Sequence, residues 1–191
     1  DLTGLGPGPG RYLSFGAYPQ PQGSFEFGSG VWHAGTAALV PLDERGIRED
    51  ATYAWLNDAS GPRHPVEGIT LPDANKVGAY TWNKAPRLAG EVIETGAIAR
   101  QLACGNPLVL DAVGHYGGTV YTRVLARLLE LARVVPMVEN WLQQLQPNEA
   151  YCAPTPVVAD GVGVGLSEAA RGSLGHWVVA DGGRIANYQI V

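Results

Sequence analysis

The sequence has few cysteines, few charged residues and no long hydrophobic run. Cys104 and Cys152 lie far apart, so they form no Cys-x-x-Cys pair, and a metal or redox site built from adjacent thiolates is excluded. Charged residues make up 16%, with a net charge of -5, so the basic footprint of a nucleic-acid-binding protein is missing. No apolar run approaches the roughly 18 residues that indicate a membrane-spanning helix.

Two enzyme signatures are also missing. Ser167 and His176 are present, but no Gly-x-Ser-x-Gly elbow of a serine hydrolase accompanies them. The glycines from Gly161 to Gly165 lack the long following helix and the Lys-Ser/Thr ending of a phosphate-binding loop. The sequence therefore favours neither an ordinary serine hydrolase nor a nucleotide-binding protein.

The 191 residues are enough for one domain with a hydrophobic core. Hydrophobic residues make up 46%, and together with the low charge this predicts a chain that buries much surface against a partner. The pattern predicts an α+β fold with a mainly helical core and hairpin-rich ends, as one segment of a larger domain. Its parts are a loop- and hairpin-rich region (1–80), a helical region (81–146) and a glycine-rich strand with a hairpin (147–191).

The first thirty residues are too rich in glycine and proline for a helix. Five aromatic side chains in this stretch argue against a disordered linker. We predict an ordered region with short strands at Arg11–Phe15 and Ser24–Phe27. Residues 50–56 fit either a strand or a short helix, because their periodicity does not decide between them.

The helical region holds two predicted helices. The first spans Glu91 to Leu102, between Gly90 and the Asn106-Pro107 pair. Its Glu94 and Arg100 are either ordinary solvated charges or ties to neighbouring elements around a buried site.

The second predicted helix spans 119–146 and begins after the candidate cap Thr119. Pro136 predicts a kink or two helices in tandem. A wide apolar stripe predicts burial on most sides, as in a bundle core, in preference to a partner interface. The stripe consists of Val120, Val124, Leu128, Leu131, Val135, Val138, Leu142 and Leu145.

The last part, Gly161 to Val191, organises the chain. A glycine-valine strand leads into a short polar knot at 167–172. A hairpin follows, with strands at 176–180 and 184–190 around an Asp-Gly-Gly turn, after a proline-punctuated connector at 151–156. A hairpin beside such a knot can hold one arginine, Arg171, in a fixed place. Alternatively, Arg171 pairs with Glu168 and only closes a turn.

Two motifs carry a resemblance to a known family. Residues 167–177 read Ser-Glu-Ala-Ala-Arg-Gly-Ser-Leu-Gly-His-Trp and resemble the late Glu-Ala-Pro-Arg-Gly motif of nickel–iron hydrogenase large subunits. Residues 80–87, followed by 94–100, resemble the family's Trp-x-Lys-Ala-Pro-Arg and Glu-x-Gly-x-Leu-Ala-Arg motifs. The match is close from Tyr80 to Val191 and loose before it. Ala170 stands where the family commonly has proline, so the loop is less pre-set.

The resemblance implies an uptake hydrogenase that cleaves dihydrogen heterolytically and passes electrons to an iron–sulfur small subunit. It implies a nickel–iron centre whose ligands, two Cys-x-x-Cys pairs, lie outside this segment, so this segment alone binds no metal. It places Arg171 above the open face of the metals as the catalytic residue. Partners would be the small subunit and the remainder of the large subunit, either in the cytoplasm or at a membrane through partner subunits.

Five further residues take supporting roles from the same resemblance: Glu168, Gly172, His176, Lys84 and Arg87. Glu168, Gly172 and His176 would fix the loop, and Lys84 and Arg87 would lie in the neighbouring motif. Simpler interpretations remain open: Glu168 as a turn-closing partner, His176 as a core histidine, and Lys84 and Arg87 in ordinary ion pairs.

Two accounts of the whole chain also remain open. The chain is either an internal piece of a longer large subunit or a degenerate relative that has lost the metal. In the second case it would be a non-catalytic subunit that binds a partner.

Overall fold

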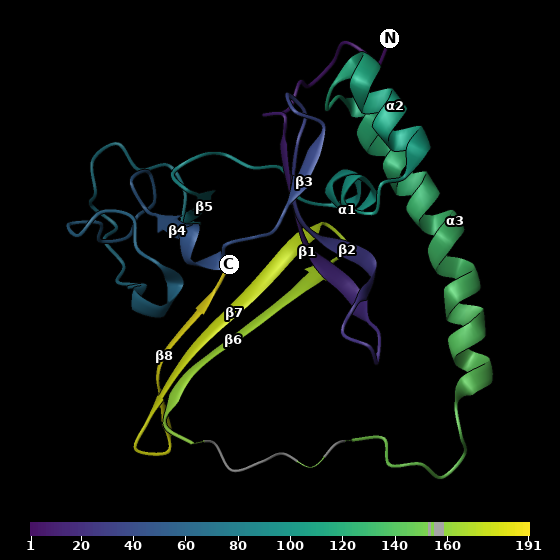
Figure 1. Ribbon diagram of the computed structural model, residues 1–191. Helices are drawn as coiled ribbons and strands as arrows, with labels where there is room; N and C mark the ends of the chain where they lie inside the picture. The colour runs from purple at the N-terminus through teal and green to yellow at the C-terminus, as the bar shows by residue number, and fades with distance from the viewer. Residues whose placement is uncertain (153, 155–158) are drawn as a thin grey trace.

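The computed structural model describes residues 1–152, 154 and 159–191, which form three small antiparallel sheets and three α-helices (Figure 1). The strands are β1 (Arg11–Pro19), β2 (Phe25–His33), β3 (Ala38–Val40), β4 (Ile47–Asp50), β5 (Ala85–Leu88), β6 (Gly161–Ala169), β7 (Gly172–Asp181) and β8 (Arg184–Ile190). The helices are α1 (Ala97–Ala103), α2 (Pro107–Tyr116) and α3 (Val120–Gln144), with 3-10 turns at Glu44–Gly46 and Pro65–Glu67. The α+β class is confirmed. The strands hold more residues than the α-helices, so the fold is mixed, although the helices supply most of the largest buried cluster.

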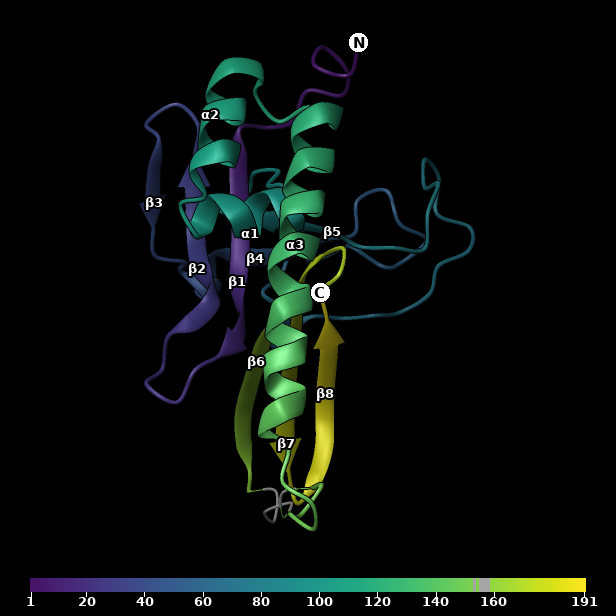
Figure 2. The same ribbon diagram turned by 90° about the vertical axis from the view of Figure 1, so that its right-hand side faces the viewer.

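The N-terminal sheet has the order β1-β2-β3, which Figure 2 shows side by side. The two predicted strands exist and extend further than expected, because Arg11 pairs with His33 and Pro19 with Phe25. Tyr12 of β1 and Phe27 of β2 are buried, so the prediction of an ordered region packed by its aromatic residues is confirmed. Of residues 50–56, Asp50 ends β4 and the rest form neither a regular strand nor a helix; Ala54 and Leu56 make only isolated bridges.

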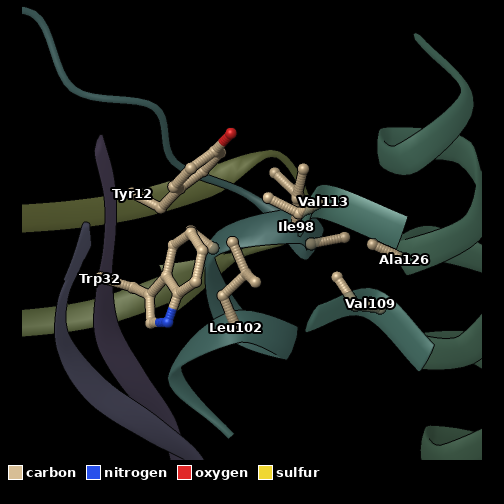
Figure 3. Packing of buried hydrophobic residues seen from close by; sticks show 9 residues of the cluster. Tyr12, Trp32, Ile98, Leu102, Val109, Val113 and Ala126 are labelled. Carbon is tan, nitrogen blue, oxygen red and sulfur yellow. The ribbon is translucent and has the colours of Figure 1, made fainter. Parts of the chain in front are cut away.

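The largest buried cluster lies where the first sheet meets the helices (Figure 3). Tyr12 and Trp32 from β1 and β2 pack against Ile98 and Leu102 of α1. A second cluster joins β1 to β7 and centres on Trp177, which is 1% exposed. The short helix α1 is therefore buried on every side, although it has only seven residues.

The first helix begins six residues later than predicted. Gly96 precedes it with φ +105, a conformation that side chains rarely adopt. Residues 91–96 instead run alongside β1, where the amide of Leu13 donates to the carbonyl of Glu94. The helix ends at Ala103, one residue after the predicted Leu102 and before the Asn106-Pro107 pair, as expected. The Asn106 side chain accepts from the amide of Leu108 and starts α2, which the sequence reasoning missed.

The long helix α3 is one continuous helix with Pro136 inside it. At its start the Thr119 amide donates to Thr122 Oγ1 at 2.8 Å, while the Thr119 hydroxyl is buried without a partner among the described residues. The predicted burial of its apolar stripe is wrong: Leu128 is 60% exposed and Leu142 is 62% exposed. The reason is that small residues on another face, Thr122 and Ala126, pack against the rest of the described chain.

The C-terminal sheet has the order β6-β7-β8. The predicted polar knot is the end of β6, a tight turn at Ala170 and Arg171, and the start of β7. The following hairpin, with its turn after Asp181, is confirmed, although β7 is longer than predicted. Of the connector expected over 151–156, residues 153, 155 and 156 lie outside the described residues.

Candidate functional site

A buried arginine from α1 lies at the centre of the site. Arg100 is 3% exposed, and its Nε and Nη2 donate to the two carboxylate oxygens of Glu130 at 2.6 and 2.8 Å. Its Nη1 donates to Glu168 Oε2 at 2.7 Å. Burial by itself would lower the pKa of Arg100, but the hydrogen bonds and charges of Glu130 and Glu168 outweigh it and raise that pKa above its ordinary value.

The same guanidinium holds the turn between β6 and β7. Nη1 donates to the carbonyl of Ala169 at 2.9 Å, and Nη2 donates to the carbonyl of Ala170 at 3.3 Å. The planar fork of an arginine suits such simultaneous contacts, which a lysine could not reproduce. Arg100 therefore ties α1, α3 and the tip of the β6–β7 hairpin together. The interpretation of Arg100 as a tie around a buried site is supported, and that of a solvated charge is wrong.

Glu168 is completely enclosed, since its side chain is 1% exposed. Besides Arg100, it accepts from the amide of Phe15 at 2.7 Å and from the hydroxyl of Ser173 at 2.6 Å. Both carboxylate oxygens are thus used within the chain. The alternative in which Glu168 pairs with Arg171 to close the turn is wrong, because Arg100 takes that place.

Arg171 lies at the exposed tip of this hairpin. In the part of the chain that the structure describes, its guanidinium has no hydrogen-bond or ion-pair partner. Its neighbour Gly172 has φ +150, and a Cβ there would clash with the side-chain oxygen of Thr95. A Cβ on Gly96 would come within 3.0 Å of the Arg171 carbonyl oxygen. The glycines therefore allow the hairpin tip to lie directly on residues 95 and 96.

A second buried charge cluster contains Lys84. Its ammonium group donates to Glu49 Oε1 at 3.0 Å and to Gln189 Oε1 at 2.9 Å. Glu49 Oε2 is buried without a partner among the described residues. Burial raises the pKa of Glu49, against the hydrogen bond and charge of Lys84, which lower it. The ion-pair interpretation of Lys84 is confirmed.

The other two predicted residues lie outside the Arg100 cluster. His176 is half-buried on β7; its Nδ1 lies 2.6 Å from the Tyr188 hydroxyl, and the two rings stack. His176 is therefore not a core histidine. Arg87 donates to the carbonyl of Pro86 at 2.8 Å and has no ion pair in the described ranges. The structure thus brings Glu168 and Gly172 together and leaves Lys84, Arg87 and His176 elsewhere.

Sequence reasoning left Arg100 open between a solvated charge and a tie around a buried site, and did not select Glu130, Glu49 or Gln189 as site residues. The position of Arg100 as a lone cation within the apolar run Ala-Ile-Ala-Arg-Gln-Leu-Ala favours the tie. Glu49 gave no signal, because it stands in a cluster of charged residues at 43–50. Across 1–152, 154 and 159–191, no group of three or more histidine, cysteine, aspartate or glutamate side chains could hold a metal ion. None of the helices described is long and apolar enough to cross a membrane.

Comparison with known proteins places this fold in a family. A family model described as nickel-dependent hydrogenase matches residues 1–191. The chain therefore belongs to the nickel-dependent hydrogenase family. It is 30% identical to the Hydrogenase-2 large chain of Escherichia coli K12, with 97% of this chain covered, and 29% identical to the periplasmic [NiFeSe] hydrogenase large subunit of Desulfomicrobium baculatum, with all of it covered.

A solved structure agrees with this assignment. The Ni-Fe-Se hydrogenase of D. vulgaris Hildenborough in the reduced state matches with a TM-score of 0.87 and 30% identity over all of this chain and 44% of its own. The chain spans 40% and 41% of the two large chains it matches. The resemblance to hydrogenase large subunits is confirmed, and it extends over the first eighty residues as well.

Proposed function

We propose that the intact protein is the large subunit of a nickel–iron uptake hydrogenase, which cleaves dihydrogen heterolytically and passes the electrons to an iron–sulfur small subunit. Support comes from the family match along the whole chain and from relatives that are themselves named as hydrogenase large subunits. The described residues supply no ligand set for a nickel–iron centre. The proposal therefore assigns metal binding to other parts of the intact protein, and no step at a metal to these residues.

The part played by this chain is to fix the tip of the β6–β7 hairpin. The observation that carries this is the clamp formed by Arg100, which is buried and bonds Glu168, Glu130 and two consecutive carbonyls of the tip. The tip is held by three contacts to one rigid group, which two further hydrogen bonds fix to Glu130 of α3. It cannot change its conformation without breaking a buried ion pair. Such preorganisation is what a charge-stabilising group requires if it is to act without reorganising during a reaction.

Arg171, beside this clamp, is the residue that we propose to act in catalysis. An arginine side chain offers a planar fork of fixed N–H donors. The side chain of Arg171 is exposed on the described chain, so it is free to face a neighbouring part of the intact protein. Gly172 supports the role by letting the tip lie on Thr95 without a clash.

The function is tested by measuring nickel content and dihydrogen oxidation on the intact protein purified with its small subunit. We expect bound nickel and hydrogen-dependent reduction of an artificial electron acceptor. An intact protein that folds with its partner but holds no nickel and oxidises no hydrogen would overturn the proposal. It would also establish the alternative, a non-catalytic subunit of the hydrogenase fold.

A further inference from the structure

The turn between β6 and β7 has an unusual backbone for a two-residue hairpin loop. Ala169 pairs with Gly172, so only Ala170 and Arg171 form the loop. The favoured two-residue turns need a positive φ at their first central residue, because this matches the twist of the two strands. Neither Ala170 nor Arg171 has a positive φ. The local turn geometry is therefore not one that holds itself, and contacts from other elements have to fix it.

Two arginines from different helices contact the peptide group that joins Ala170 to Arg171. Arg100 of α1 donates from Nη2 to the Ala170 carbonyl at 3.3 Å, and the same nitrogen donates to Glu130 at 2.8 Å. The 3.3 Å bond is the longest that Arg100 makes. Arg127 of α3 donates from Nη1 to the same carbonyl at 3.4 Å. Among the described residues this is the only polar contact of Arg127, whose side chain is otherwise exposed.

The conformation of Ala170 determines where Arg171 points. A change in the φ or ψ of Ala170 moves its carbonyl and turns the next residue, Arg171, at the same time. A proline at position 170 would fix φ near −65° through its ring, whereas an alanine leaves φ free. Arg127, Ala169 and Ala170 also line a cavity of about 330 Å³, so within the described chain this side of the turn faces open space. Donors on the Ala170 carbonyl are therefore what limits the freedom of the turn.

We propose that Arg127 is a positioning residue, which limits the motion of the Ala170 peptide and thereby directs the Arg171 guanidinium. The proposal rests on the proposed function, in which Arg171 acts in catalysis. Arg127 supplements Arg100 at the carbonyl that Arg100 holds least closely. The contact is single and exposed, so its loss should hardly change the global stability of the protein. Its effect is confined to the turn and to the residue that the turn carries.

Hydrogen exchange of the turn tests this without nickel or activity. The intact protein with its small subunit is compared with Arg127→Met, with the double variant that adds Ala170→Pro, and with Arg184→Met. Arg184 is an exposed arginine at the β7–β8 turn, at the opposite end of the sheet (Figure 1), and serves as the matched control. In Arg127→Met the amides of Arg171 and Gly172 should exchange at least about fivefold faster, because the turn opens locally more often.

The double variant should regain slow exchange, because the ring of proline limits the turn without help from Arg127. The substitution fits the site: the amide of Ala170 makes no hydrogen bond within the described residues, and Ala169 lies in a strand, the conformation that favours a following proline. Arg184→Met should exchange at the turn like the unaltered protein.

Turnover gives the second measurement. In Arg127→Met the kcat of hydrogen oxidation should fall by about five- to tenfold with KM and nickel content unchanged, because a misdirected group slows the reaction without weakening substrate binding. Adding Ala170→Pro should restore most of the kcat. Since proline brings back no charge, this recovery separates positioning by Arg127 from a mere effect of its charge.

Other outcomes overturn the proposal. Unchanged exchange at the turn in Arg127→Met does so whatever the activity, and so does a loss of kcat that Ala170→Pro leaves unrestored. Faster exchange that Arg184→Met shares shows only a general loss of stability. If the double variant does not fold, Arg127→Lys replaces it: a lysine keeps one donor for the carbonyl and should give an intermediate exchange rate, and a rate equal to that of Arg127→Met rejects the proposal. An unaltered protein without nickel or hydrogen oxidation would contradict the proposed function and leave the exchange result standing.

Discussion

Two buried charge clusters in this molecule use similar groups but differ in completeness. Around Arg100, three guanidinium nitrogens all donate, and both oxygens of Glu168 accept. Around Lys84, Glu49 uses one oxygen, while Oε2 is buried without a partner in the described chain. The first cluster joins three elements, and the second joins β4 and the end of β8 through Lys84 and Gln189.

We call the Arg100 cluster a lock, because both oxygens of its buried Glu168 have partners. We call Glu49 a group under tension, because one of its buried oxygens has no partner among the described residues. A buried ion pair contributes little net stability, but removing one partner leaves a costly uncompensated charge. That cost should be greatest at Glu168, because its buried carboxylate would lose the cation with which it pairs. In the Lys84 cluster the cost of burial is already visible, because the pKa of Glu49 is raised. Substitutions in the two clusters should therefore differ in how much they change stability and in how that change depends on pH.

The largest effect is expected at Arg100. Arg100→Met should destabilise the protein by about 3–5 kcal/mol, because it leaves the buried Glu168 and Glu130 carboxylates without their cation. Arg127→Met is the matched control: Arg127 is exposed and makes only a 3.4 Å contact with the Ala170 carbonyl. The control should cost less than about 1 kcal/mol. Denaturant unfolding measures both, and equal small losses would show that the Arg100 cluster is not a lock.

The next largest effect is expected at Arg171, which lies in the turn that the Arg100 cluster holds. If Arg171 acts in catalysis, Arg171→Lys keeps the charge but loses the planar fork, and hydrogen oxidation should fall by about a hundredfold or more, with nickel content unchanged. If Arg171 has no such role, the substitution should leave turnover intact and change stability by less than about 1 kcal/mol. Hydrogen uptake and nickel content are measured together on the intact enzyme. Full activity with full nickel rejects the catalytic role, and lost nickel indicates a structural one.

The sequence allowed part of this picture to be predicted. The β7–β8 hairpin could be read from alternation and the Asp-Gly-Gly turn, because local turn chemistry specifies it. The β6–β7 hairpin was not predicted, since its turn was interpreted only as a polar knot. The late helix start at Gly96 could not be read, because it depends on the contact between Gly96 and Arg171 across the fold. The existence of α3 followed from its apolar period, but its buried face did not. Periodicity shows that a face is apolar and not which neighbour covers it.

The candidate site was predictable only where it lay within a motif. Glu168 and Gly172 were selected because they belong to the motif that resembles the family's late motif, and the structure places both beside the β6–β7 turn. Arg100 and Glu130 lie far from that motif along the chain and meet it only through the packing of α1 and α3. A pairing between distant elements has no local signature, so spacing suggested the wrong partner for Glu168.

The effect of the Lys84 cluster on protein stability should depend on pH. The pKa of Glu49 in the folded protein lies above its ordinary value of 4.5, so over the pH range just above 4.5 the unfolded chain binds fewer protons than the folded one. Stability should therefore fall as pH rises through that range. Glu49→Gln does not titrate and should lose this fall, so its stability relative to the unaltered protein should improve with pH. A constant difference between the two proteins from pH 4 to 7 would show that Glu49 is not under tension.

The smallest effect concerns an unpaired group without charge. The Tyr12 hydroxyl is buried with no partner among the described residues, and burial, reinforced by the charge of Glu94, raises its pKa to about 12. Tyr12→Phe removes only this hydroxyl and keeps the ring against Trp32, so stability near neutral pH should change by less than about 1 kcal/mol and need not fall.

Above the ordinary value of 10.0 for the tyrosine pKa, the unfolded chain loses the phenolic proton first. The unaltered protein should therefore lose stability with rising pH, and Tyr12→Phe should lose less. Denaturant unfolding at pH 7 and pH 10.5 measures both, with Tyr12→Ala as the control that removes the ring and should cost about 3–5 kcal/mol. A large loss of stability for Tyr12→Phe at pH 7 would mean that the hydroxyl has a partner in the intact protein. Tyr12 would then be a fully hydrogen-bonded buried group like Glu168, and not one with an unpaired atom like Glu49.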